Sequence, residues 1–173
     1  LFAALILTDT VVFPISEYPK LGTVLDLVGS SLFTEINAVT NFLIWGTYRF
    51  GIRTRKLTRA ERKEYQKMFD TREKRRRITR MLYDLKRSEA YMASVKKGFE
   101  TTLKSFPTLL IYGEKDPVNQ LGIADRIHQL LPHSDLFLIN NEGHFPHEGQ
   151  AQHMSELMDH WLQKIDTLIA QPT

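Results

Sequence analysis

The stretch Pro107-Thr-Leu-Leu-Ile-Tyr-Gly-Glu-Lys-Asp116-Pro-Val decides the fold of this chain. Its continuous apolar run from Thr108 to Tyr112 stops at Gly113, a pattern typical of a buried parallel strand. Asp116 follows in the loop at the carboxyl end of that strand. In an open parallel α/β sheet, such loops and the helix N-termini after them converge on one crevice, where reactive groups collect. Asp116 is therefore the first candidate for a functional residue.

The same reasoning predicts two more strands, alternating with helices. Apolar runs at Phe2–Leu7 and Leu136–Ile139 each end in a turn-rich segment, whereas Leu121–Leu131 and Ala151–Ile169 are amphipathic and predict helices. From Thr108 onward the order is strand, helix, strand, helix, which indicates a parallel sheet with right-handed crossovers. The predicted fold class is α/β, with parallel strands and flanking helices.

The middle of the chain has a different pattern and a concentrated charge. Residues Arg49 to Lys104 contain 19 Lys and Arg against 7 Asp and Glu, a net +12, so the remaining residues, with 4 against 13, carry −9. Thr58 with Glu61 forms a capping box, and Thr71 is a plausible second helix N-cap. The more apolar segment between Leu21 and Tyr48 predicts one or two further helices. The middle is therefore predicted to be all-helical.

Composition excludes several function classes. With 173 residues, 42% of them apolar and 25% charged, the chain is globular in composition. The absence of cysteine excludes disulfides, thiol nucleophiles and thiolate metal sites, and it is consistent with a cytoplasmic location. No apolar run reaches the roughly 20 residues of a membrane span, and no basic residue precedes the apolar start, so neither a membrane span nor a signal peptide is expected. The start at Leu1, within a predicted strand, suggests a piece of a longer chain.

Three strand-end loops present chemically useful side chains: Asp9, Asp116 and His144. An Asp and a His on neighbouring strand ends can hydrogen-bond, so that the carboxylate fixes the imidazole tautomer and the other ring nitrogen acts as a base. Taken singly, Asp116 is also a common turn residue ahead of Pro117, and His144 a common loop histidine. Taken together with their strands, they predict two members of a hydrolytic triad.

Two motifs extend this prediction to a family. Pro107 to Val118 resembles the seventh strand and acid loop of the α/β-hydrolase superfamily, and Asn141-Glu-Gly-His144-Phe-Pro-His-Glu148 resembles its histidine loop. The segment Leu57 to Arg75 is most similar to the cap of haloalkane dehalogenase-type members, which are close to epoxide hydrolases. The resemblance implies the carboxyl-terminal half of that fold: strand six in residues 1–14, a helical cap in 15–104, and strands seven and eight with their helices in 105–173.

By this resemblance Asp116 is the triad acid and His144 the general base. The family's nucleophile is a Ser or Asp on a tight turn that precedes the acid, and no such pentapeptide occurs in the chain. An Asp nucleophile would form a covalent ester that water, activated by His144, hydrolyses, as in haloalkane dehalogenases, the first choice, and epoxide hydrolases, the second. A Ser nucleophile would instead make an esterase. The sequence leaves this choice open, and the chain alone is expected to be inactive.

The resemblance also suggests further site residues. Some dehalogenases place the acid after strand six, which makes Asp9 a minor alternative acid, a site carboxylate or a strand-end cap. Trp45 and Tyr48 of the cap, together with Phe145, are expected to line a pocket for a small apolar substrate. No metal is expected, because the other histidines lack suitable ligand spacing, and the resemblance implies no organic cofactor.

A non-enzymatic alternative rests on the basic middle of the chain. The positive charge of this segment, which contains the run Lys74 to Arg77, could bind the phosphates of nucleic acid or an anionic membrane surface. The segment lacks the interleaved aromatic residues of single-strand binders and any groove-reading motif, so a solvated cap surface is the favoured interpretation. The expected partner is instead a missing amino-terminal half, or a partner segment, that completes the sheet beside the first strand.

Overall fold

The computed structural model describes residues 3–169, and the chain divides into two compact units. The core unit comprises Leu1–Val11, Gly51–Arg55 and Phe99–Thr173, and the helical unit comprises Val12–Phe50 and Lys56–Gly98. The helical unit begins at Val12 and ends at Gly98, and the expected cap limits of 15 and 104 stay a prediction. One feature was not foreseen: the short segment Gly51–Arg55, between two helices of the helical unit in sequence, belongs to the core unit.

A parallel sheet of three strands forms the centre of the core unit. Its strands are β1 (Leu5–Thr8), β2 (Thr108–Gly113) and β3 (Ser134–Ile139), in the order β1-β2-β3. The register places Leu5 beside Thr108 and Thr108 beside Ser134. All of β2 is buried, as its continuous apolar run predicts. Phe2, the first residue of the expected first strand, lies outside the described residues.

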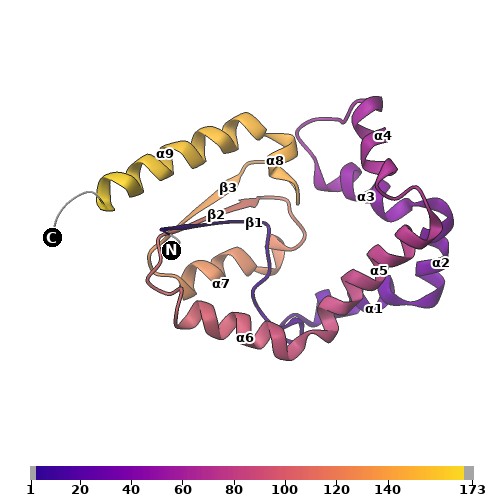
Figure 1. Ribbon diagram of the computed structural model, residues 1–173, viewed down its shortest axis with the longest axis horizontal. Coiled ribbons are helices and arrows are strands. Elements are labelled where there is room, and N and C mark those ends of the chain that lie inside the picture. Colours follow the sequence, from indigo (N-terminus) through magenta and orange to yellow (C-terminus); the bar gives the residue numbers. More distant parts are fainter. Residues whose placement is uncertain (1–2, 170–173) are drawn as a thin grey trace. The chain divides into compact units, whose positions relative to one another are not determined.

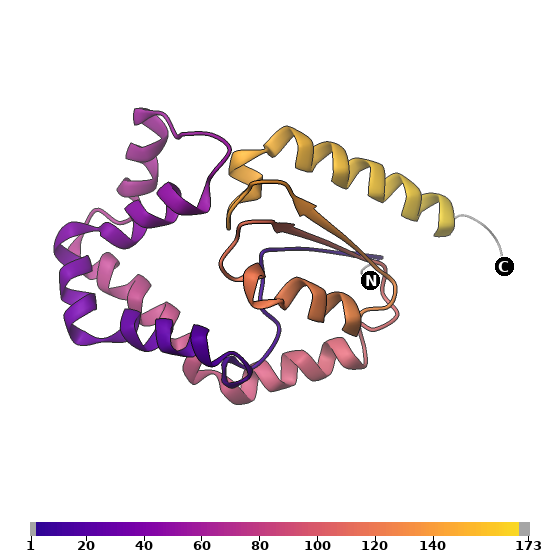
Figure 2. The same ribbon diagram turned by 180° about the vertical axis from the view of Figure 1, so that it is seen from behind.

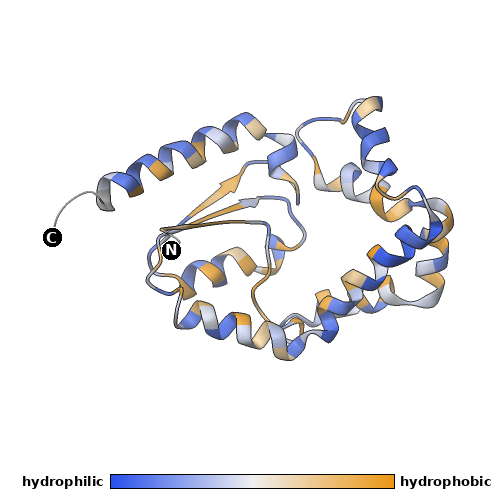
Figure 3. Ribbon diagram, in the orientation of Figure 1, coloured by the Kyte–Doolittle hydropathy of each residue, from blue (hydrophilic) through white to orange (hydrophobic). Residues whose placement is uncertain are grey.

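Helices α7 (Ile123–Leu130) and α9 (Ala151–Ile169) cover opposite faces of this sheet (Figures 1 and 2). Apolar residues recur between polar ones along α9 (Figure 3). On the face of the sheet that α9 covers, its residues Trp161 and Met154 form a core cluster with Leu109 and Ile111 of β2. Two short helices, η2 (Asn119–Leu121) and α8 (Pro146–Gly149), lie in the loops. Gly122, at φ 76°, separates η2 from α7, so the helix predicted over Leu121–Leu131 is present but begins at Ile123.

Seven helical elements begin in the helical unit, and their bounds follow in chain order: η1 (Ile15–Glu17), α1 (Pro19–Gly29), α2 (Ser31–Thr40), α3 (Phe42–Gly51), α4 (Arg59–Lys67), α5 (Arg72–Arg87) and α6 (Glu89–Glu100). The expectation of one or two helices before Tyr48 was too low, because α1, α2 and α3 are separate. Ser30 ends α1 and caps α2, accepting a hydrogen bond from Phe33 N, and Asn41 ends α2 in a left-handed conformation. The predicted capping box of Thr58 with Glu61 is confirmed.

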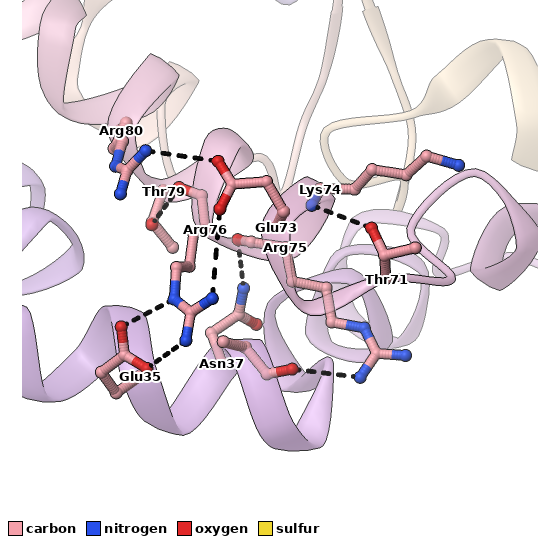
Figure 4. A network of polar contacts seen from close by, with 10 residues as sticks. Glu35, Asn37, Thr71, Glu73, Lys74, Arg75, Arg76, Thr79 and Arg80 are labelled. Atoms are coloured by element: carbon pink, nitrogen blue, oxygen red, sulfur yellow. Dashed lines mark hydrogen bonds and ion pairs between the residues drawn. The ribbon is translucent and has the colours of Figure 1, made fainter.

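The basic helix α5 is tied to α2 by polar contacts (Figure 4). Arg76 forms a bidentate ion pair with Glu35, and both nitrogen–oxygen distances are 2.7 Å. The Arg75 guanidinium donates to the carbonyls of Ala38 and Val39, which are at the carboxyl end of α2. These contacts satisfy helix-terminal carbonyls and engage part of the basic run within the unit. No helix in residues 3–169 combines the length and the hydropathy needed to cross a bilayer.

Candidate active site

The acid loop after β2 holds Asp116 in one orientation. The side chain is fully buried, and its Oδ1 accepts a hydrogen bond from Val118 N at 2.9 Å. The Asp116 N–H donates in turn to the Gly113 carbonyl at 3.1 Å. This local bonding between an Asp side chain and the backbone two residues on is the reason that Asp precedes Pro in such turns. Asp116 Oδ2 is left to face the next loop.

That loop, after β3, brings His144 to Asp116. The His144 Nδ1 lies 3.1 Å from Asp116 Oδ2, so the predicted contact between the two side chains is present. The hydrogen bond to Asp116 raises the pKa of His144, partly opposed by burial, and the charges of Asp116 and Asp9 add to the rise. Because a carboxylate only accepts, Nδ1 carries the proton and Nε2 is the nitrogen able to act as a base. The roles of triad acid and general base stay predictions.

The two loops also meet through their backbones. Lys115 N donates to the Glu142 carbonyl at 2.7 Å, next to the end of β2. Gly113 is in such close approach that a Cβ at this position would overlap the carbonyl oxygen of Gly143. Glycine is therefore required here for the loops to come together. The backbones of the acid loop and the histidine loop are therefore in direct contact.

Asp9, at the end of β1, is the third side chain of the site. Its Oδ1 accepts from Gly113 N at 2.9 Å, while Oδ2 is buried and has no hydrogen-bond partner among the described residues. Burial raises the pKa of Asp9 to about 7; the bond from Gly113 opposes this rise, and the Asp116 charge adds to it. The backbone at Asp9 is in the left-handed region, with φ 40°. The role of Asp9 as an alternative acid, a site carboxylate or a strand-end cap therefore stays a prediction.

Asp9, Asp116 and His144 each offer a ligand atom within 4.8 Å of the others, a spacing that a cation could also bridge. In this arrangement, however, the facing atoms of Asp116 and His144 are already paired with each other, and the second oxygen of Asp116 is bonded to the backbone. The geometry favours a carboxylate–imidazole pair over a metal centre.

The three predicted substrate-binding residues are in different places. Phe145 follows His144 directly, and its ring lies edge-on to the imidazole, with 5.1 Å between the ring centroids. The Phe145 ring also packs on Gly51, because a Cβ at Gly51 would overlap the ring. Trp45 and Tyr48 are on α3 in the helical unit: the Trp45 side chain is 49% exposed, whereas Tyr48 is buried and accepts a hydrogen bond from Gln66. The pocket-lining role of all three stays a prediction.

Glu142 was missed by sequence reasoning. Its side chain is completely buried, although glutamate in a turn-rich segment normally faces water. The carboxylate accepts hydrogen bonds from Arg53 N at 2.5 Å, from Thr54 N at 3.2 Å, from the Thr54 hydroxyl and from Gly143 N at 3.0 Å. The position next to Gly143 and His144 was visible in the sequence, but the approach of segment 51–55 was not.

Comparison with known proteins identifies the family of this chain from its sequence. The sequence model of the alpha/beta hydrolase fold matches residues 19–151. The chain belongs to the α/β-hydrolase fold family. Within this fold, the Asp116–His144 pair lies on the loops that follow the adjacent strands β2 and β3. No curated protein matches the chain by sequence.

Solved structures of haloalkane dehalogenases share this α/β-hydrolase fold. Haloalkane dehalogenase DbeA from Bradyrhizobium elkani aligns with a TM-score of 0.74 at 16% identity, over 97% of this chain and 61% of its own. Haloalkane dehalogenase DatA from Agrobacterium tumefaciens aligns with a TM-score of 0.74 at 18% identity, over 94% of this chain and 58% of its own. The chain thus spans about 60% of the length of these structures, and the likeness at this identity concerns the fold.

Proposed function

We propose that this chain is the carboxyl-terminal part of a haloalkane dehalogenase-like hydrolase and supplies the acid and base of its active site. The observation that carries the proposal is the contact of the buried Asp116 carboxylate with His144 Nδ1 at 3.1 Å. The fold shared with haloalkane dehalogenases supports the choice within the superfamily. The substrate would be small and largely apolar.

The proposed reaction has two steps. A nucleophilic carboxylate outside the 173 residues displaces halide from a carbon atom and forms an alkyl ester. His144 Nε2 then takes a proton from water, which attacks the ester carbonyl, while Asp116 stabilises the imidazolium that forms. The second step releases alcohol, restores the nucleophilic carboxylate and returns the proton to solvent. In this scheme His144 serves ester hydrolysis and is not needed for the first attack.

Because His144 is needed only for the second step, the proposal can be tested with the complete polypeptide that contains this sequence. His144→Ala is incubated with a bromoalkane, an epoxide or an aryl ester, and the intact mass of the protein is measured. With an Asp nucleophile the first step survives, so a stable alkyl adduct accumulates and one equivalent of bromide is released. With a Ser nucleophile, which needs the histidine to lose its proton, no adduct accumulates.

The controls separate the outcomes. Unaltered protein is expected to release bromide continuously without a lasting adduct, and an adduct formed only from the epoxide would transfer the proposal to epoxide hydrolysis. Continuous turnover of the aryl ester alone would indicate an esterase. Lack of turnover of all three substrates by the unaltered protein would overturn the hydrolase proposal.

The open edge of β1 supports a partner for the sheet. Among the described residues, β1 pairs with β2 on one side only. We propose that an amino-terminal half, in the same polypeptide or as a separate segment, pairs with the other side and brings the nucleophile. Limited proteolysis of the complete polypeptide tests this idea, because two fragments that stay associated after cleavage ahead of β1 are expected.

A further inference from the structure

We infer that Glu142 is a positioning residue: its buried carboxylate clamps segment Gly51–Arg55 onto the histidine loop and thereby holds His144 against Asp116. This role goes beyond the acid and base themselves. It rests on the proposed function for its catalytic meaning, but its main test requires no substrate.

The first support is the number of donors that converge on one carboxylate. A buried charge is costly unless hydrogen bonds replace its water. Glu142 has four such donors, namely the N–H groups of Arg53, Thr54 and Gly143 and the hydroxyl of Thr54. Three of the four come from segment Gly51–Arg55. A side chain with this much backbone bonding has one position available to it.

The second support is where the clamp acts on the chain. Gly143 and Phe145 flank His144, and both of their N–H groups are held: Gly143 N by the Glu142 carboxylate and Phe145 N by the Gly51 carbonyl at 2.9 Å. The Glu142 carbonyl in turn accepts from Lys115 N of the acid loop. Glu142 therefore connects the segment, the histidine loop and the acid loop through its two ends.

The third support is the packing around the carboxylate. A Cβ at Gly149 would overlap Glu142 Oε2 and would also press on the Thr54 hydroxyl. The carboxyl end of α8 thus leaves no room for a side chain at residue 149 beside the carboxylate. Because side chains are tightly packed there, displacement of the carboxylate would have to move the histidine loop.

Glu142→Gln is the informative variant. It keeps size and shape, but its amide NH₂ must face N–H and O–H donors, so at least one donor from the segment loses its acceptor. We expect the loop to shift and the Asp116–His144 bond to weaken. The pKa of His144, followed by NMR of ¹⁵N-labelled histidine in the complete polypeptide, should fall toward the value of an unpaired histidine, as it should in Asp116→Asn.

Matched controls separate positioning from general loss of stability. Glu148→Gln makes the same chemical change in a carboxylate that pairs with Arg55 of the same segment at 3.1 Å, and should leave the His144 pKa in place. Thr54→Val removes one donor and should lower that pKa, whereas Thr54→Ser keeps the hydroxyl and should restore it. These Thr54 variants also serve if Glu142→Gln fails to fold.

The outcomes decide the inference independently of the reaction. If Glu142→Gln and Thr54→Val reduce the unfolding free energy but leave the His144 pKa unchanged, Glu142 is only structural and the inference is overturned. In the complete polypeptide, Glu142→Gln should lower kcat on the order of tenfold with KM unchanged, because ester hydrolysis needs an oriented base. A shifted His144 pKa in a polypeptide without hydrolase activity would keep the positioning role and reject the proposed function.

Discussion

Two carboxyl groups of different character face His144, and the difference between them is chemical as well as positional. Asp116 is fully buried, and each of its two oxygens has a hydrogen-bond partner. Asp9 has one bonded oxygen and one buried oxygen without a partner, together with a pKa near neutrality. The two groups therefore have distinguishable effects when each is replaced by its amide.

Asp116→Asn is expected to lower kcat of the complete polypeptide by about 10³–10⁴, because the amide NH₂ opposes Nδ1–H and forces the wrong imidazole tautomer. Asp9→Asn should retain the bond from Gly113 N through its amide oxygen and change kcat much less. Steady-state rates of the two variants, measured side by side, provide the check. The reverse order would make Asp9 the acid.

The raised pKa of Asp9 predicts a dependence of stability on pH. The folded chain holds this proton up to about pH 7, whereas the unfolded chain releases it near pH 3.8. The folded state therefore binds more protons between these values, and stability falls as pH rises through them. Asp9→Asn should reduce this slope and stabilise the chain at pH 8 by on the order of 1 kcal/mol, after allowance for solvent screening.

Urea unfolding of the original chain and of Asp9→Asn at pH 5 and pH 8 measures this effect. The stabilisation should be present at pH 8 and much smaller at pH 5. His144, whose pKa is also raised, adds stability that is present below its ordinary pKa and lost as pH rises through the folded one. The Asp9 charge is the smallest of the causes that raise the pKa of His144, so this contribution changes little in Asp9→Asn. A parallel pH dependence of stability in the two proteins would therefore contradict the assignment to Asp9.

Among the secondary-structure elements, a glycine at the end of a strand and a glycine inside a helix differ in the space available for a side chain. Gly113 ends β2 against the backbone of Gly143, whereas Gly98 lies inside α6 with open space where a Cβ would be. Gly113→Ala should lower the unfolding free energy by about 1–3 kcal/mol through overpacking. Gly98→Ala should raise it by about 0.5–1 kcal/mol, because alanine restricts the unfolded chain and favours the helix.

Denaturant unfolding measures the unfolding free energy of both glycine variants, and the His144 pKa provides a second measurement. Gly113→Ala should lower that pKa because it pushes the acid and histidine loops apart, and Gly98→Ala should leave it unchanged. A stable Gly113→Ala variant with an unchanged His144 pKa would show that the loops do not depend on their close approach.

The sequence predicted those elements whose pattern is periodic and local. The strands at Thr108 and Leu136, the helix at Ala151 and the capping box at Thr58 follow from apolar runs and turn residues, and the approach of Asp116 to His144 follows from adjacent parallel strands. Breaks that depend on one backbone angle, as at Gly122, were not anticipated.

Contacts between segments far apart in sequence were also not predictable. Glu142 is separated from Thr54 by 88 positions, and nothing in the composition of segment 51–55 indicates that it enters the core unit. Burial of a charged side chain depends on donors supplied by another part of the chain, and a single sequence gives no pairing between them. The contact between Asp116 and His144 was therefore within reach of sequence reasoning, whereas the contacts that support the two loops were not.

For the molecule as a whole, the open edge of β1 predicts self-association of the isolated chain. Leu5 N and Asp9 N donate to the β2 side, so in a parallel ladder the N–H groups of Ile6 and Thr8 point to the open edge. Unpaired edges of this kind recruit other strands. Sedimentation of the 173-residue chain should show association that rises with concentration.

Thr8→Pro removes one outward N–H without removing a bond to β2 and should weaken this association, whereas Thr8→Val, which keeps the N–H, should not. A monomer at all concentrations, or equal association of both variants, would show that β1 is not the contact. In the complete polypeptide, where the edge is proposed to be paired, the same Thr8→Pro change should instead reduce stability.

The cramped turn at Gly149 has a consequence for how this protein can evolve. Any side chain at this position collides with the Glu142 carboxylate, which is itself fixed by donors from a distant segment. A mutation that enlarges residue 149 is therefore tolerated only after residue 142 has become shorter, so the order in which the two mutations occur is constrained. Homologous sequences should accordingly show covariation between the two positions, with glutamate at 142 only where 149 is glycine.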